Sequence, residues 1–185
     1  MAIMATRGSE GGNFEPAPQG VHQAVCVDVI DKGILEVTYA GETKKQHKIV
    51  LSWQIDETRE DGKPFLVSKR YTLSLNEKAT LRKDLESWRG RAFTRDEEAG
   101  FDVESVLGAN CLLNIQHKTV GDKTYANVVS IMPLVKGMGK IAAKGYVRLS
   151  EREPEHTTNI KPPADDFGGG MPDDDQIPFN RMESY

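Results

Sequence analysis

The segment HKIVLSWQI at 47–55 alternates apolar and polar side chains almost without a break, Val50 being the exception. One face carries four large apolar side chains, Ile49, Leu51, Trp53 and Ile55. The other face carries three polar ones, Lys48, Ser52 and Gln54. A period of two residues is typical of a β-strand that is buried on one face only. The chain is therefore expected to contain a half-buried strand here.

Other segments rich in β-branched and apolar residues predict further strands around this one. They cover 21–30, with a short piece at 34–39 after a turn at 31–33, then 65–75, 111–118 and 123–132. An Asp-Gly pair lies in the loop 56–64, and Gly121 lies between the last two strands, so both connections are expected to be hairpins.

The period changes from two to 3.6 residues at Asn76, which predicts a helix capped by Asn76 and ended by a left-handed Gly90. Its apolar face would hold Leu81, Leu85 and Trp88. A second, short helix is expected to start at a cap on Asp102 and to finish at Gly108.

The order of these elements, with one helix between the third and fourth of five strands, predicts a mainly β, OB-fold-like five-stranded barrel. The expected organisation is a flexible N-terminal arm at 1–20, the OB-fold-like domain at 21–135, an extension at 136–150 of helical or irregular character, and a disordered acidic tail at 151–185. Other β-rich architectures would give a similar order of elements.

The net charge of -4 is distributed unevenly. Residues 151–185 hold nine Asp/Glu against three Lys/Arg, whereas 42–91 hold twelve Lys/Arg against eight Asp/Glu. Such a separation of positive and negative charge bears on which partners the protein binds and not on its fold. Cys26 and Cys111 lie in apolar runs and are expected to be buried free thiols. No apolar run approaches the roughly 18 residues of a membrane span, so no membrane association is expected.

Cations and aromatic rings recur along the expected strands and helix. Single-stranded nucleic acid needs cations for its phosphates and aromatic faces for its bases. The candidate binding residues are Lys48, Trp53, Lys69, Arg70, Tyr71, Arg82, Arg89, Arg91, Lys118, Lys123 and Tyr125. Trp53 shares a face with apolar residues and is also a candidate for the core. Tyr71 is in register with Phe65 and Val67, so it too is either buried or part of the binding face.

Motifs for catalysis are missing from the sequence. The four histidines are scattered, no Cys/His pair has zinc-ligand spacing, and no phosphate-binding glycine loop occurs. Carboxylates such as Asp56 and Glu57 fall in a loop, where solvation is their ordinary role. The sequence therefore predicts a protein that is not an enzyme and needs no metal or other cofactor.

The tail segment DDDQIPF resembles the acidic DDDIPF tip of bacterial single-stranded DNA-binding proteins. In that family the tip docks into basic pockets on replication and repair proteins. The residues that would do so here are Asp173, Asp174, Asp175, Ile177, Pro178 and Phe179. Two departures are that Gln176 interrupts the motif and that six residues follow Phe179, which removes the terminal carboxylate from it.

The body, over about 13–135, is similar to single-stranded DNA-binding proteins of tailed bacteriophages and prophages, on segments such as SKRYTLSLNEKATLRKDLESWRGRAFT and YANVVSIMP. That resemblance implies an OB-type DNA-binding domain in a phage-type protein that coats single-stranded DNA during replication, recombination or repair. The N-terminal residues resemble neither a secretory signal nor a transit peptide, so the cytoplasm of a bacterial host is the expected location. The tail would recruit replication or recombination proteins, and a homodimer is possible. The alternative is an interaction module whose acidic tail imitates DNA and blocks a nuclease or another host factor.

Overall fold

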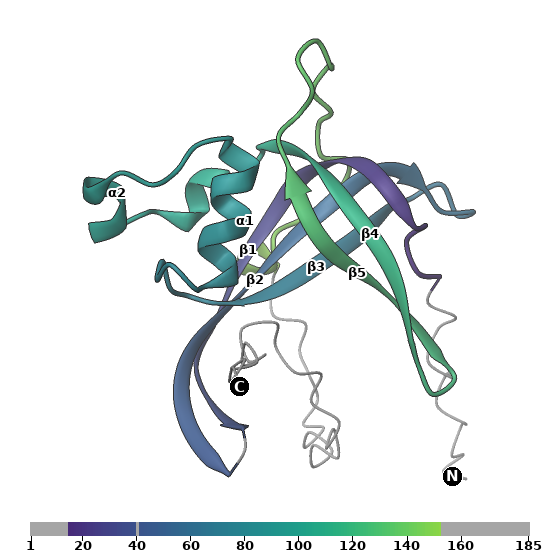
Figure 1. Cartoon of the computed structure of the whole chain (residues 1–185). Helices are drawn as coiled ribbons and strands as arrows, with labels where there is room; N and C mark the ends of the chain where they lie inside the picture. The colour runs from purple at the N-terminus through teal and green to yellow at the C-terminus, as the bar shows by residue number, and fades with distance from the viewer. Residues whose placement is uncertain (1–14, 40, 153–185) are drawn as a thin grey trace, which may run out of the picture.

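The computed structural model describes residues 15–39 and 41–152. Its core is one five-stranded antiparallel sheet in the order β3-β2-β1-β4-β5 (Figure 1). The strands are β1 (Gly20–Tyr39), β2 (Glu42–Thr58), β3 (Pro64–Thr72), β4 (Asn110–Val120) and β5 (Lys123–Met132). Between β3 and β4 lie the helices α1 (Thr80–Arg89) and α2 (Arg95–Ala99) and the short 3-10 helix η1 (Val103–Val106). The prediction of a mainly β protein with five strands is confirmed.

The first strand is longer than the sequence pattern suggests. The predicted turn at 31–33 lies inside β1, where a shift of register against β2 marks a β-bulge. Gly33 adopts φ 70°, and its N–H donates to Asp31 Oδ1 at 2.7 Å. An Asp two residues before a left-handed Gly occurs in bulges as well as in turns, so the local sequence alone does not distinguish a bulge from a turn. Pairing with β2 on both sides of the bulge carries the strand through.

The prediction that one face of 47–55 is open to solvent is wrong. Lys48, Ser52 and Gln54 are only 2%, 3% and 5% exposed. Lys48 Nζ donates to Thr72 Oγ1 at 2.8 Å, and the Ser52 and Ser68 hydroxyls lie 2.8 Å apart across the β2–β3 pair. These polar groups tolerate burial because each one is hydrogen-bonded.

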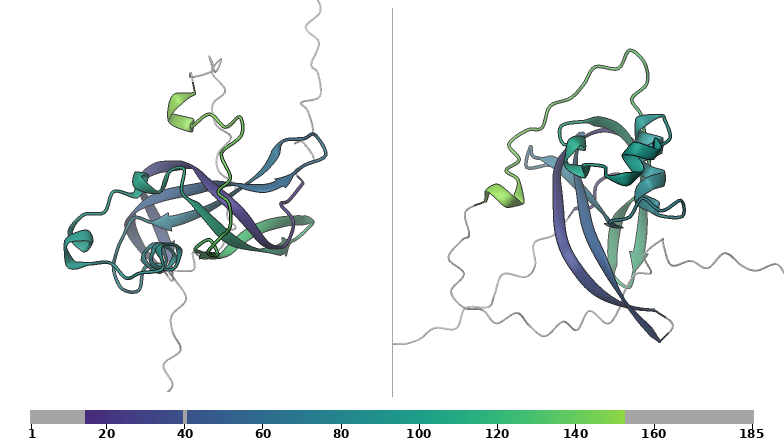
Figure 2. Two further views of the ribbon diagram at one scale, coloured as in Figure 1. Left: turned by 90° about the horizontal axis from the view of Figure 1, so that it is seen from above. Right: turned by 90° about the vertical axis from the view of Figure 1, so that its left-hand side faces the viewer.

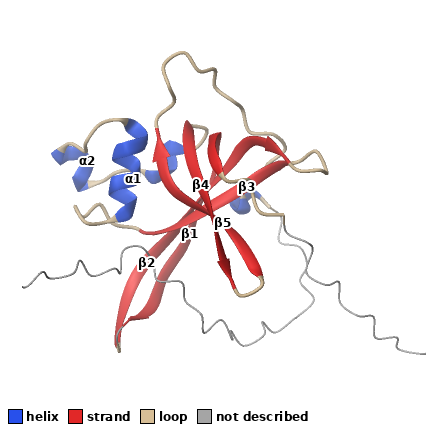
Figure 3. Ribbon diagram, turned by 45° about the vertical axis from the view of Figure 1, so that its right-hand side comes forward, coloured by secondary structure: helices blue, strands red, loops and turns tan. Residues whose placement is uncertain are grey.

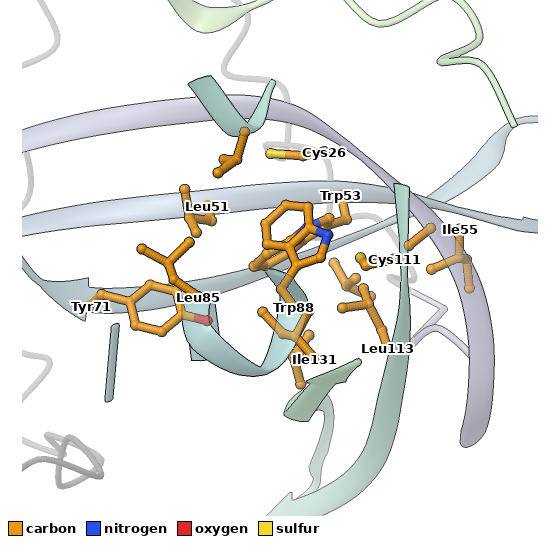
Figure 4. Packing of buried hydrophobic residues seen from close by; sticks show 14 of the residues in the cluster. Cys26, Leu51, Trp53, Ile55, Tyr71, Leu85, Trp88, Cys111, Leu113 and Ile131 are labelled. Carbon is orange, nitrogen blue, oxygen red and sulfur yellow. The ribbon is translucent and has the colours of Figure 1, made fainter. Parts of the chain in front are cut away.

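The sheet is curved but not closed into a barrel, which corrects the expected closure. Some Cα atoms of β3 and β5 lie within 8 Å of each other. The described strands nevertheless pair only with their neighbours in the order β3-β2-β1-β4-β5, so no hydrogen-bonded ladder joins β3 to β5. Helix α1 packs against both strands. It buries its Leu81, Leu85 and Trp88 there, as the helical period predicts, and Figure 4 shows the last two. Side chains of the helix therefore fill the space that a further strand pairing would close.

The helical part differs from the prediction at its ends. Helix α1 begins at Thr80 after a turn in which the Ala79 N–H donates to the Asn76 carbonyl, so Asn76 is not the cap. Gly90 ends it at φ 67°, as predicted. The expected helix after Asp102 is the shorter η1, capped by Asp102. Helix α2, which sequence analysis missed, has only five residues, too few to show a 3.6-residue period.

Residues 134–149, which we call the strap, follow β5 and cross the outer side of the sheet as a chain of mostly irregular structure with a turn at 136–137 (Figure 2). Three side-chain amides hold its backbone. Gln23 Nε2 donates to the Gly139 carbonyl at 2.6 Å. Asn110 exchanges two hydrogen bonds with Ile141, and Gln54 exchanges two with Lys144. The extension predicted at 136–150 is therefore part of the folded body.

The far end of the strap is fixed by Asp28, which is 1% exposed. Its Oδ2 accepts hydrogen bonds from the Tyr146 hydroxyl and the Leu149 N–H, both at 2.8 Å. Burial disfavours ionisation of Asp28, but these bonds and Arg148 outweigh it and hold the pKa of the carboxyl below its usual value. The Asp28 carboxylate thus joins the middle of β1 to the end of the strap.

The predicted N-terminal arm and acidic tail lie mostly outside the described residues. Of the arm, the structure describes only 15–20, which pack on the body: Ala17 is 2% exposed, and its carbonyl lies 2.7 Å from His117 Nε2. Residues Asp173, Asp174, Asp175, Ile177, Pro178 and Phe179 are not among those described. Among the helices that are described, none has the length and apolar character to cross a membrane.

Candidate nucleic-acid interface

The structure divides the predicted binding residues into three groups by their surroundings. The first group is buried in or beside the core: Lys48, Trp53 and Tyr71. The second is ion-paired on the side of the helices: Lys69, Arg82, Arg89 and Arg91. The third is exposed: Arg70, Lys118, Lys123 and Tyr125. Sequence position does not predict the grouping, since Lys69, Arg70 and Tyr71 are consecutive and fall into three different groups.

The buried group stabilises the fold. Trp53 is 0% exposed, and its ring lies 6.1 Å from that of Trp88 (Figure 4). Tyr71 is 1% exposed and donates its hydroxyl hydrogen to Asp84 Oδ2 at 2.8 Å. Burial, followed by the Asp84 charge, raises the pKa of Tyr71, so the phenol remains a donor. Neither ring presents a face on which a base could stack.

The ion-paired group meets carboxylates that come from α1 itself and from α2. Lys69 Nζ lies 2.8 Å from Asp84 Oδ2. Arg82 contacts Glu86 at 3.0 Å and Glu98 at 2.6 Å. A cation that already has a carboxylate partner must lose it before it can bind a phosphate. These residues are therefore weaker candidates for phosphate binding than the sequence alone suggests.

Glu97 of α2 is the centre of this ion-paired cluster. Its carboxylate accepts hydrogen bonds from Arg91 at 2.7 and 3.1 Å and also contacts Arg89. Hydrogen bonds from Arg91, from the Thr94 N–H and from Arg89 lower the pKa of Glu97 to about 2. Arg89 also lies over the rings of Phe93 and Phe101, 4.6 and 5.2 Å from their centroids. The geometry explains these arginines as supports of the α1–α2 region.

The β4–β5 hairpin gathers three of the four exposed candidates. Lys118 lies directly opposite Tyr125 in the antiparallel register, and Lys123 lies two residues before Tyr125 on the same face. Tyr125 is 42% exposed. Within the described part of the chain, neither lysine forms an ion pair. An open aromatic ring beside two unpaired cations has the composition of a stacking and phosphate-binding site.

Arg70 lies on the outer face of β3, opposite Val50 of β2. It has no carboxylate partner among the described residues, and the neighbouring Ser68 is also exposed. The alternation along β3 puts Tyr71 into the core and Arg70 outside, so the outer face is the one available to a ligand.

The two long hairpins, β1–β2 and β4–β5, extend to the same side of the molecule with their tips apart (Figure 1, Figure 3). The β1–β2 tip carries Lys44 and Lys45, which lie 3.1 and 3.8 Å from Glu42 and Glu36, respectively. These pairs are highly exposed and contribute little to stability, so both lysines can exchange partners. The hairpins thus carry exposed cations at two separate tips on one side of the molecule.

Sequence analysis missed three exposed lysines of the strap, namely Lys136, Lys140 and Lys144. The signal was present in the sequence, because residues 123–150 contain five Lys/Arg and no Asp or Glu. It was hidden by the apolar and glycine-rich character of 134–147, which gives no period of a helix or strand.

The described residues contain no group of three or more His, Cys, Asp or Glu arranged to hold a metal ion. Asp56 and Glu57 are exposed at the end of β2. Cys26 and Cys111 are buried free thiols, as predicted, and burial raises the pKa of Cys26 to about 12, which makes it a poor nucleophile.

Comparison with known proteins does not assign the chain to a family. No model of a known protein family matches this chain, and no curated protein matches it either.

Proposed function

We propose that this protein binds single-stranded DNA without catalysing a reaction and with little preference for sequence. In this proposal it coats exposed strands during replication, recombination or repair in a bacterial host, as a bacteriophage protein would. The exposed outer surface binds DNA, and the acidic tail recruits other proteins. The observation that carries the proposal is the open Tyr125 ring beside the unpaired Lys118 and Lys123 on the β4–β5 hairpin.

The proposed fold is a variant of the OB-fold. Five antiparallel strands, a helix between β3 and β4, and a near approach of β3 to β5 support it. The OB-fold is a partly open five-stranded barrel that binds oligonucleotides on the face of its second and third strands and on the loops that join β1 to β2 and β4 to β5. Arg70, the β1–β2 tip and the β4–β5 hairpin occupy these places here.

The proposed binding chemistry has two parts. Bases stack on Tyr125, and stacking on one aromatic ring contributes roughly 1–3 kcal/mol in a way that tolerates any base. Phosphates bind Arg70, Lys118 and Lys123, which should make the affinity fall steeply with salt. The ion-paired arginines around Glu97 have no part in this proposal.

The tail residues Asp173–Asp175 and Ile177–Phe179 are proposed to recruit replication or recombination proteins. Three carboxylates steer the segment toward Lys/Arg on a partner, and the Ile-Pro-Phe group supplies an apolar anchor. The support for this role is the sequence of the segment, since it lies outside the described residues.

The test is a fluorescence-anisotropy titration of labelled dT30 and of the matching duplex with the full-length protein, at several salt concentrations. The expected result is salt-sensitive binding that favours the single strand. Tyr125→Ala should weaken binding about fivefold or more, which is the lower end of the loss of one stacked base. Leu73→Ala, on an exposed apolar residue beside Phe101 that the proposal does not use, is the control.

Absence of single-strand binding by the wild-type protein would overturn the proposal. Retention of a host nuclease or replication protein on a column of the full-length protein, lost when 164–185 are removed, would then favour the DNA-mimic alternative. Magnesium-dependent cleavage of the labelled strand, lost in Asp56→Asn, would instead indicate a nuclease.

A further inference from the structure

We infer that the strap, residues 134–149, is a basic contact strip for the phosphates of a bound single strand, which places part of the binding site outside the hairpins. The inference rests on the proposed function and adds to it a second surface. It starts from Lys136, Lys140 and Lys144, which are exposed. Their spacing of four residues is regular, and no acidic residue lies among them.

The backbone of the strap is held in a way that leaves its lysine side chains free. Asn110 Oδ1 accepts from the Ile141 N–H at 2.8 Å while its Nδ2 donates to the Ile141 carbonyl at 3.0 Å. Gln54 does the same with Lys144, at 2.7 and 2.9 Å. Each amide imitates the two hydrogen bonds of a paired strand. The backbone is thereby fixed on the sheet by contacts that do not use the lysine side chains.

The charge of the strap is not neutralised by its surroundings. Of its four cations, only Arg148 is ion-paired, with Asp28 at 3.5 Å and Glu104 at 2.7 Å. The ammonium groups of the three lysines have no carboxylate partner among the described residues. Like charges held on one short segment repel one another, and a phosphate backbone relieves that repulsion while releasing its counterions.

The strap borders the outer face of β3. Gln54, which holds Lys144, lies opposite Leu66 of β3, and Arg70 follows on the same face of that strand four residues later. Figure 2 shows the strap crossing the sheet from the end of β5. A strand that contacts Arg70 can therefore meet Lys144 and its neighbours without leaving this side of the molecule.

The test is the salt dependence of dT30 binding by the full-length triple variant Lys136→Gln/Lys140→Gln/Lys144→Gln. A single strand contributes about 0.7 to the slope of log K against log salt per neutralised phosphate, so three lost contacts lower the slope by about 2. At about 0.1 M salt this is a loss of affinity of roughly a hundredfold. A parallel titration of rU30 should show the same change of slope in the variant, because contacts to phosphate alone do not distinguish RNA from DNA.

The matched control is Lys78→Gln/Lys83→Gln/Arg95→Gln, which removes the same charge from exposed positions on the helical side. Its slope should stay close to that of the wild type. Equal losses in both triple variants would overturn the strip in favour of a general effect of net charge. An unchanged slope in the strap variant, with the wild type still binding, would overturn the strip alone. No binding by the wild type would overturn the proposed function and the strip together.

A second measurement does not depend on variants. Acetylation of lysines, followed by mass spectrometry, should show Lys136, Lys140 and Lys144 protected by saturating dT30, with Lys78 and Lys83 reacting as in the free protein. Equal reactivity of the strap lysines with and without dT30 would overturn the inference.

Discussion

The arginines of the helical side and the lysines of the strap lie in different surroundings. On the helical side Arg82, Arg89 and Arg91 each meet a glutamate of α1 or α2. On the strap three lysines are exposed, and the chain from 123 to 150 supplies no acid to pair with them. A cation therefore becomes available to a ligand where no carboxylate lies near it in space.

Asp84→Ala tests how strongly the helical side depends on its ion pairs. It removes the acceptor of the Tyr71 hydroxyl, which is buried, and the partner of Lys69, whose side chain is 12% exposed. We expect a loss of about 2–4 kcal/mol in the free energy of unfolding, because a buried donor and a largely buried charge are left without an acceptor. Urea denaturation measures it.

The control for that variant is Lys83→Ala, at the preceding and exposed position of α1. It should change the free energy of unfolding by less than about 0.5 kcal/mol. Similar losses in the two variants would mean that the Asp84 contacts contribute nothing beyond the change of helix residue.

Asp28→Ala tests the attachment of the strap. The variant leaves the Leu149 N–H and the Tyr146 hydroxyl without their acceptor, at a cost of about 1–3 kcal/mol. The strap should then open more often, so trypsin should cleave after Lys140 and Lys144 faster than in the wild type. Asp122→Ala, in the exposed β4–β5 turn, is the control. Unchanged cleavage of the strap would show that the amides of Gln23, Asn110 and Gln54 hold it without Asp28.

Arg70→Gln and Arg82→Gln test whether an unpaired arginine contributes more to DNA binding than an ion-paired one. Arg70 is exposed and has no carboxylate partner among the described residues, so its loss should weaken dT30 binding about fivefold at about 0.1 M salt, the effect of one phosphate contact. Arg82, bound to Glu86 and Glu98, should change binding less and thermal stability more. The reverse order in anisotropy titrations would contradict the assignment of these two arginines.

Glu97→Gln has the smallest expected effect at neutral pH and a distinct dependence on acid. The folded pKa of Glu97 is about 2, below the ordinary 4.5, so its ionised form stabilises the fold above pH 4.5, and this contribution is lost as the pH falls toward 2. The variant lacks this contribution, so its stability should fall less steeply between these two pH values. Circular dichroism during urea unfolding at several pH values measures the slope. Parallel pH profiles for the two proteins would contradict the role of Glu97.

Much of the fold was determined by the sequence itself, through local patterns. The alternation along 65–73, the 3.6-residue period of Leu81, Leu85 and Trp88, and the glycines at 90 and 121 predict strands, helix and turns that the structure contains. These features follow from the backbone preferences of neighbouring residues, so they can be read from short segments. The burial of Cys26 and Cys111 was also predictable, because both lie in apolar strands.

Only the tertiary structure decided which polar side chains are open to a ligand. Lys48 and Gln54 occur at positions of an exposed face, yet cross-strand hydrogen bonds and the strap bury them. Arg89 is paired because α2 brings Glu97 to it, and β1 continues past Gly33 because β2 pairs with it on both sides of the bulge. Burial and ion pairing depend on contacts between segments that are far apart in the chain, so they cannot be predicted from the residues next to a side chain in the sequence.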